Sequence, residues 1–152
     1  MNTRADLALY NSRGRLTAIV EAKSKMNTSS EWATMTRRNI VARWNIDGID
    51  FFLLVTPDRL YMWKDAGTRH SPVPPTHKAD TTAEFAPYFK GAGVSPKRIT
   101  GHAFELVVGA WLGDVMRSAR RADENTDTLR TLVESGLDTA VRDGRIEYEA
   151  VV

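Results

Sequence analysis

The chain has 152 residues, no cysteine, a formal net charge of +2 and a pI near 9.0. Its length predicts a single domain over residues 1–152, with a composition typical of a globular protein. The lack of cysteine excludes disulfides and zinc–thiolate sites and is typical of a cytoplasmic protein. A polar N-terminus and apolar stretches interrupted by Glu105 or Asp114 predict neither a signal peptide nor a membrane span. So small a net charge does not by itself indicate a nucleic-acid partner.

Two apolar runs joined by a polar turn open the chain. Arg4–Tyr10 and Leu16–Lys23 have the residue types of strands, and residues 11–15 between them contain the glycine of a tight turn. In such a hairpin the first strand runs away from Asp6 and the second strand returns. The sequence therefore predicts that Asp6 and Glu21 lie at the same end of the hairpin.

The residues predicted at that end are of the types that hold a hard divalent cation. Glu21 and Lys23 share one face of their strand, whereas Ala22 leaves its carbonyl at the strand edge. Asp6 and Glu21 would supply the carboxylates that Mg²⁺ prefers. A lysine beside such a cation can hold or deprotonate an attacking water and offset charge on phosphorus. The alternative is an edge strand with an ordinary solvated pair, Glu21 and Lys23, which contributes little stability.

A helix is predicted from Thr28 to about Trp44 or Asn45. Thr28 and Glu31 have the spacing of a capping box, which satisfies free amides at a helix start. Arg37 falls within the apolar stripe of this helix. We expect it either to contact a phosphate or carboxylate, or to bury its stem and extend its head to water.

Three groups of basic residues are candidates for phosphate contact. Each group on its own is interpreted as a solvated helix end or loop, and we expect at least one of them to contact phosphate. The groups are Arg37 and Arg38 with Arg43, Lys97 with Arg98, and Arg117 with Arg120 and Arg121.

A second hairpin is predicted over residues 50–64. Asp50–Thr56 is hydrophobic on both faces and predicts a central strand that is buried from both sides. After a turn, Arg59–Lys64 returns as an outer strand. Residues 65–80 are rich in proline and predict a surface loop.

The C-terminal half is predicted to be mainly helical and to end in a strand. Helices are expected from Thr81 to about Tyr88 or Phe89, from Thr100 or Gly101 to about Arg120, and over 128–134 and 137–142, with a strand over 145–152 that could close a sheet edge. The 101–120 helix is apolar almost all round, so it either crosses the sheet or offers a dimer surface. His102 and Glu105 at its start are interpreted through the helix dipole, with a position facing the site as the alternative.

The arrangement of Asp6, a hairpin turn and Glu21-Ala22-Lys23 at the end of an apolar strand resembles the core of the PD-(D/E)XK nuclease superfamily. The resemblance covers roughly residues 4–64 and is nearest to the nuclease region of type I restriction subunits. It implies a restriction-endonuclease-like α/β fold, a mixed central sheet flanked by helices. It also implies Mg²⁺ or Mn²⁺ held by Asp6, Glu21 and the Ala22 carbonyl, with Lys23 acting on the water.

The chain departs from that superfamily at its start. The superfamily core normally begins with a helix, which often carries a further glutamate, and with a strand ahead of the one that carries the aspartate, whereas only five residues precede Asp6. The first helix is therefore expected to be missing, or to be replaced by a segment such as 118–142 or by a partner subunit. A homodimer through the 101–120 helix is a further expectation.

Three functions follow as hypotheses. The first is a metal-dependent DNA endonuclease, a hydrolase in which Asp6, Glu21 and Lys23 are catalytic and Arg37 and Arg38 contact DNA. The second is a catalytically inactive nuclease-fold module for DNA or protein binding and dimerisation. The third is a phosphate-binding regulator in which Arg37 and Lys23 grip an anion without a metal.

Overall fold

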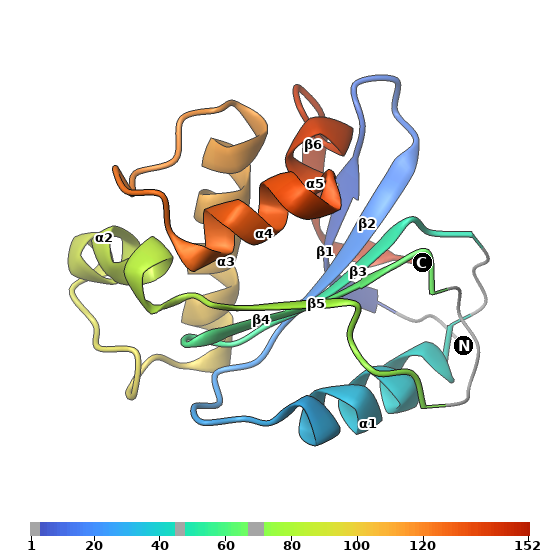
Figure 1. Ribbon diagram of the computed structural model, residues 1–152, viewed down its shortest axis with the longest axis horizontal. Coiled ribbons are helices and arrows are strands. Elements are labelled where there is room, and N and C mark those ends of the chain that lie inside the picture. The colour runs from blue at the N-terminus through green and yellow to red at the C-terminus, as the bar shows by residue number, and fades with distance from the viewer. Residues whose placement is uncertain (1–3, 45–47, 67–71) are drawn as a thin grey trace.

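The computed structural model describes residues 4–44, 48–66 and 72–152. It is an α/β fold, in which helices cover both faces of a six-stranded mixed sheet (Figure 1). The strands are β1 (Arg4–Tyr10), β2 (Leu16–Ala22), β3 (Phe51–Val55), β4 (Arg59–Lys64), β5 (His77–Asp80) and β6 (Arg145–Val151). The helices are α1 (Ser30–Val41), α2 (Thr82–Ala92), α3 (Gly101–Met116), α4 (Asp127–Ser135) and α5 (Leu137–Ala140).

The sheet order is β5-β4-β3-β2-β1-β6, so the first and last strands of the chain are neighbours. Only β2 and β3 are parallel, and α1 provides the crossover between them. All other pairs are antiparallel. This order places β1 between β2 and β6, where its residues can meet side chains from both neighbouring strands.

The turn between β1 and β2 is fixed by one side chain and one glycine. The Asn11 side-chain oxygen accepts hydrogen bonds from the backbone N–H groups of Arg13 and Arg15, both at 3.0 Å. Gly14 has φ +81°, which a residue without a Cβ adopts readily. The predicted hairpin is confirmed, and Leu7 pairs with Val20 near its open end.

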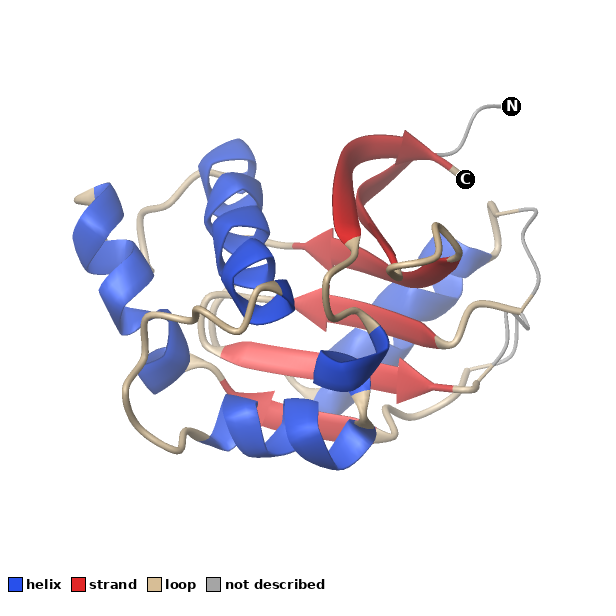
Figure 2. Cartoon of the chain, turned by 90° about the horizontal axis from the view of Figure 1, so that it is seen from above, coloured by secondary structure: helices blue, strands red, loops and turns tan. Residues whose placement is uncertain are grey.

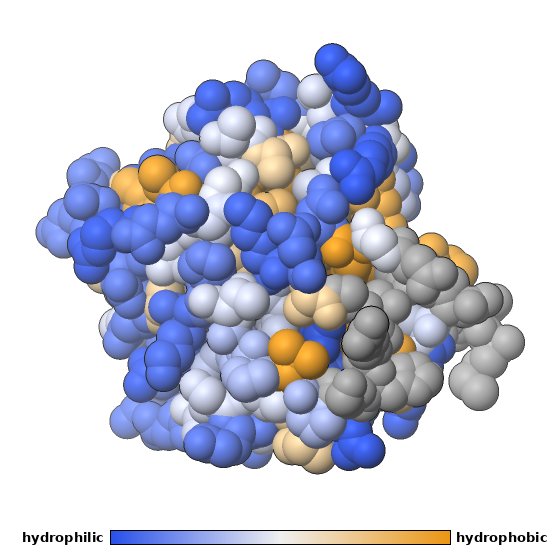
Figure 3. Space-filling model, turned by 45° about the vertical axis from the view of Figure 1, so that its right-hand side comes forward, coloured by the Kyte–Doolittle hydropathy of each residue, from blue (hydrophilic) through white to orange (hydrophobic). Residues whose placement is uncertain are grey.

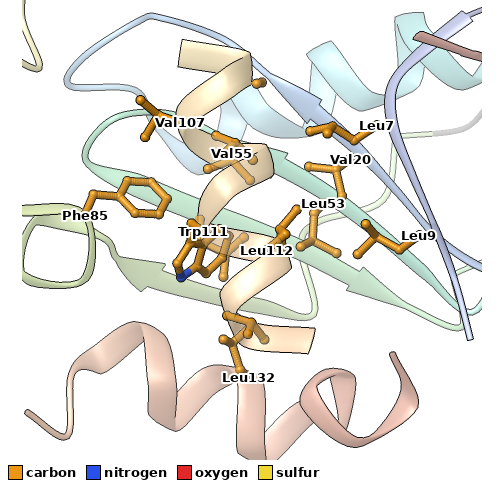
Figure 4. Packing of buried hydrophobic residues seen from close by; sticks show 14 of the residues in the cluster. Leu7, Leu9, Val20, Leu53, Val55, Phe85, Val107, Trp111, Leu112 and Leu132 are labelled. Carbon is orange, nitrogen blue, oxygen red and sulfur yellow. The ribbon is translucent and has the colours of Figure 1, made fainter. Parts of the chain in front are cut away.

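A hydrophobic core lies on each face of the sheet. On one face, α3 lays Val107, Trp111 and Leu112 against Leu53 and neighbouring strand residues (Figure 4). On the other face, α1 covers a smaller cluster that includes Ile19, Phe52 and Trp63. Figure 2 shows α1 on the side of the sheet away from the other helices. The double coverage explains why β3 is apolar on both faces, as the sequence predicted.

Several predicted boundaries are corrected by the structure. The helix cap is Ser29, whose hydroxyl accepts from the N–H of Trp32, whereas the hydroxyl of Thr28 hydrogen-bonds that of Tyr61 at 2.8 Å. The helix ends at Val41, and Asn45, one of its predicted ends, lies outside the described residues. The long helix ends at Met116 rather than near Arg120.

The prediction of a loop up to residue 80 is wrong for its last part. His77–Asp80 forms β5, which pairs with β4 and makes β4 an inner strand. Segment 118–142 covers this side of the sheet, where the hydroxyl of Thr128 donates to the carbonyl of Asp80 at 2.9 Å. The helix after β5 continues through Pro87 to Ala92, beyond its predicted end.

Exposed apolar side chains are few and scattered. The face in Figure 3 is mainly hydrophilic, and its apolar side chains lie in small separate areas. Most apolar residues of α3 are buried, although Leu106 is 51% exposed, so the predicted dimer through this helix stays a prediction. No helix within residues 4–44, 48–66 and 72–152 is long and apolar enough to cross a membrane.

Candidate functional site

The candidate site begins where the pairing of β1 and β2 stops. Backbone pairing extends as far as Leu7 and Val20. At the next position, side-chain carboxylates accept the backbone hydrogen bonds. The N–H of Asp6 donates to Oε2 of Glu21, and the N–H of Ala22 donates to Oδ2 of Asp6, each at 2.9 Å. Two carboxylates therefore replace backbone acceptors, and the hairpin brings Asp6 and Glu21 together as the sequence predicted.

The pairing of β1 and β6 is interrupted at the same residue. Ala5 pairs with Ala150 and Leu7 with Tyr148, so Glu149 lies opposite Asp6 between two regular pairs. Glu149 has φ +50°, the left-handed region, which costs a residue with a Cβ about 1–2 kcal/mol. Asp6 is therefore flanked by an acidic side chain on each side within the sheet.

A fourth carboxylate comes from a helix, α3. Oxygen atoms of Asp6, Glu105 and Glu149 lie within 4.8 Å of one another. Glu105 is 8% exposed and lies one turn into the helix. One turn further on, Gly109 lacks the side chain that would collide with the ring of Tyr148. This close approach holds β6 against α3, so that the acids of the two elements can meet.

The electrostatics of the site favour bound protons or a bound cation. Burial raises the pKa of Glu21 to about 8, and its side-chain hydrogen bond to Asp6 and the charge of Asp6 act in the same direction, whereas the hydrogen bond from the Asp6 backbone N–H lowers it. The positive charge of Lys23 acts against this rise. Burial raises the pKa of Glu105 to about 7, with further contributions from Glu149 and Asp6. Carboxylates this close disfavour ionisation of one another.

Lys23 and Ala22 occupy the positions that the strand register predicted. The backbone N–H of Lys23 donates to the carbonyl of Val55 at 2.9 Å, which fixes the chain at the end of β2. The side chain of Lys23 is exposed, and its charge acts on Glu21. The N–H of Ala22 points toward Asp6, and in a strand the carbonyl of a residue points to the same side as its N–H.

The structure does not support the expected phosphate contact of Arg37. Its side chain is 1% exposed, and its guanidinium carbon lies 5.8 Å and 5.5 Å from the ring centres of Phe52 and Trp63. A residue held within the core between α1 and the sheet does not reach a nucleic acid. Arg38 is exposed on the outer side of α1, and its contact with DNA stays a prediction.

Sequence reasoning assigned no role in the site to Glu149 and favoured the helix dipole for Glu105. Glu105 reaches Asp6 only because α3 crosses the sheet, and Glu149 only because β6 pairs with β1. The signal in the sequence was Glu105 itself, an acid that interrupts the first apolar part of a helix that is apolar almost all round. A buried, unpaired acid in such a helix is rare enough to indicate a functional contact.

A separate polar cavity of about 340 Å³ lies at the start of α1. Its lining includes Thr28, Tyr61, Lys78 and Asp80, and none of the clustered acids. Arg59 in its wall is already paired with Asp80 at 3.3 Å. This cavity is therefore distinct from the carboxylate cluster.

Comparison with family models, with curated proteins and with solved structures finds no match to this chain.

Proposed function

We propose that this chain is a Mg²⁺-dependent phosphodiesterase that cleaves DNA, built on a variant of the restriction-endonuclease-like fold. The observation that carries the proposal is the convergence of four carboxylates, from β1, β2, α3 and β6, beside an exposed lysine. Asp6 is at the centre of this cluster. Glu105 and Glu149 lie on one side of it and Glu21 on another.

The donor set fits a hard divalent cation. All candidate ligands are oxygens, since the cluster contains carboxylates and the Ala22 carbonyl but neither histidine nor cysteine. Asp6, Glu105 and Glu149 are close enough to share one ion. Glu21 and the Ala22 carbonyl would complete the shell from the β2 side, as the resemblance to the nuclease superfamily implies. A cation would also relieve the repulsion that raises the carboxyl pKa values.

Each group of the proposed site would have a role in hydrolysis. The bound cation would lower the pKa of water and offset charge on the phosphoryl oxygens. Lys23, on the same strand face as Glu21, would orient the attacking water or accept its proton. The water oxygen then forms a bond to phosphorus in line with the bond that breaks, and the leaving 3′ oxygen takes up a proton. The products are a 5′-phosphate and a 3′-hydroxyl, as the resemblance implies.

The topology supports the proposed fold. The superfamily core normally begins with a helix that often carries a glutamate and with a strand ahead of the aspartate strand. In this chain β6 lies beside β1, and α3 carries Glu105 to the aspartate. We infer that the C-terminal half provides both elements, in a different chain order. Segment 118–142, expected as one replacement, instead packs near β5.

Calorimetric titration and DNA cleavage test the proposal together. We expect Mg²⁺ or Mn²⁺ to bind at millimolar concentration or below and to be required for cleavage of DNA. Glu105→Gln should weaken binding and cleavage by at least tenfold, as expected for loss of a ligand or its neighbour. Glu134→Gln, which changes an exposed acid on α4, is the matched control and should leave both unchanged. Absence of divalent-ion binding by the folded protein would overturn the proposal and favour the inactive module.

A further inference from the structure

Five exposed basic side chains belong to two segments that meet at the start of α3, about one turn before Glu105. Lys23 and Lys25 follow β2, and Lys97, Arg98 and His102 precede or begin α3. Figure 1 shows both segments at the lower end of α3, and a Cβ at Gly101 would lie 4.0 Å from the hydroxyl of Ser24. We call these five residues the basic rim.

The basic rim lies within reach of the clustered acids. His102 and Glu105 are three residues apart on α3 and therefore neighbours on one helix face. Glu105 lies only about 6 Å along the helix axis from Gly101, at 1.5 Å per residue. Arg98 is held in a turn by a bond from its N–H to the carbonyl of Ser95 at 3.1 Å. The chain enters α3 beside the cluster, with its cations on the surface.

The lysine and arginine cations of the basic rim are not neutralised within the part of the chain that the structure describes. None of the five forms an ion pair there, although Lys25 lies over the ring of Trp32. Arginines elsewhere are largely paired, as in Arg120 with Glu84 at 2.8 Å and Arg117 with Asp114 at 2.9 Å. In the described ranges, exposed lysine and arginine side chains without an ion pair therefore lie near the acidic cluster.

We propose that the basic rim binds the phosphate backbone of DNA on either side of the phosphate held at the carboxylate cluster. The inference deepens the proposed function, on which it rests, and names a polynucleotide rather than a mononucleotide as the substrate. Four carboxylates repel a polyanion, so neighbouring phosphates need positive side chains to approach the site. Lysine and arginine contacts to phosphate are independent of sequence and predict strong salt dependence.

Fluorescence anisotropy can measure the binding of a short labelled DNA duplex in EDTA at several salt concentrations. This experiment tests the basic rim without metal or catalysis. The double variant Lys97→Ala with Arg98→Ala should weaken binding, and the slope of log K against log salt should fall by about one per lost contact. The control is Arg13→Ala with Arg142→Ala, which removes the same charge from exposed positions. These lie near the other end of β1, where Tyr10 is four residues from Asp6, about 14 Å by strand rise, and should leave affinity and slope closer to the wild type.

The rim and the proposed chemistry can fail separately. With Mn²⁺, the 97/98 double variant should lose at least tenfold in cleavage of DNA but hydrolyse bis(4-nitrophenyl) phosphate at the wild-type rate. An equal loss of DNA affinity in the rim and control variants, or no loss in either, would overturn the proposal that the basic rim binds DNA. If DNA binding depends on the basic rim but neither substrate is hydrolysed, the rim is confirmed as a DNA-binding surface and the proposed phosphodiesterase activity is refuted. Circular dichroism of each variant identifies any loss caused by misfolding, and Lys25→Ala then provides an independent test.

Discussion

Asp6 donates its backbone N–H to the carboxylate of Glu21 over 2.9 Å, in place of a bond that two paired strands would make between their backbones. The Asp6 carboxylate in turn accepts the N–H of Ala22. Each acid is thus oriented by the backbone that carries the other. Regular backbone pairing between the two strands ends at this point, and two oriented carboxylates take its place.

Neutralising one of these acids should remove the response to metal without unfolding the chain. Glu21→Gln keeps an oxygen that can accept the Asp6 N–H but can no longer ionise beside another carboxylate. In EDTA we expect a melting temperature at or above that of the wild type. Addition of Mg²⁺ at about a hundred times its Kd should stabilise the wild type by about 2.7 kcal/mol and the variant much less.

Thermal unfolding with and without Mg²⁺ measures both effects, and Glu134→Gln is the control. If Mg²⁺ stabilises the Glu21→Gln variant as much as the wild type, Glu21 does not contribute to metal binding.

The stability of the metal-free protein should fall as the pH rises. The pKa values of Glu21 and Glu105 in the folded protein, about 8 and about 7, exceed their ordinary value of 4.5. Between these limits the folded protein binds more protons than the unfolded chain, so its free energy of unfolding decreases with pH. The stabilisation is complete below pH 4.5 for these two groups and is lost as the pH passes through 7 to 8.

Urea unfolding in EDTA at several pH values checks this slope. Saturating Mg²⁺ should flatten it, since a cation replaces the protons. A free energy of unfolding that rises between pH 6 and about 8 in EDTA would contradict the raised pKa values.

Removal of the Lys23 amine should separate catalysis from metal binding. In Lys23→Met the apolar stem is retained, whereas the group that would orient or deprotonate water is lost. We expect DNA cleavage to fall by about 10²–10⁴-fold, the usual range for a general acid or base. The affinity for Mn²⁺, measured by calorimetry, should change little because the carboxylates remain. Lys90→Met on α2 is the exposed control; near-wild-type cleavage by Lys23→Met would exclude the catalytic role.

A buried ion pair beside α3 provides a test of the fold that is independent of function. Glu84 is fully buried and accepts bonds from Trp111, Thr126 and Arg120. Arg120→Ala would leave this carboxylate without its cation and should destabilise the protein by about 3–5 kcal/mol. Arg117→Ala breaks a pair in which the arginine side chain is 68% exposed and should cost about 1 kcal/mol or less. Equal losses in chemical denaturation would contradict this assignment.

The sequence predicted those parts of the site that depend on local pattern. The Asn11 turn and the alternation of β2 determine that Asp6, Glu21 and Lys23 meet at one end of a hairpin. Glu105 and Glu149 join them through contacts between elements about a hundred residues or more apart in the chain, which no local period encodes. The capping pattern at residue 28 was off by one because a serine and a threonine are adjacent there and both can cap.

The strand β5 was missed for a related reason. It has only four residues, three of them polar, and follows a stretch rich in proline. Its pairing with β4 and the bond from Thr128 hold it in place, and both come from tertiary structure. Short edge strands of this kind lack the alternation that local analysis detects.

The most direct test of the central claim is the anomalous density of crystals soaked in Mn²⁺. The account predicts a peak bound by carboxylate oxygens of Asp6, Glu105 and Glu149, at the distances of about 2.0–2.6 Å typical of hard cations with oxygen ligands. It also predicts loss of that peak in crystals of Glu105→Gln. The absence of a peak among these acids, or a peak unchanged by the substitution, would contradict the proposal that the cluster is a metal centre.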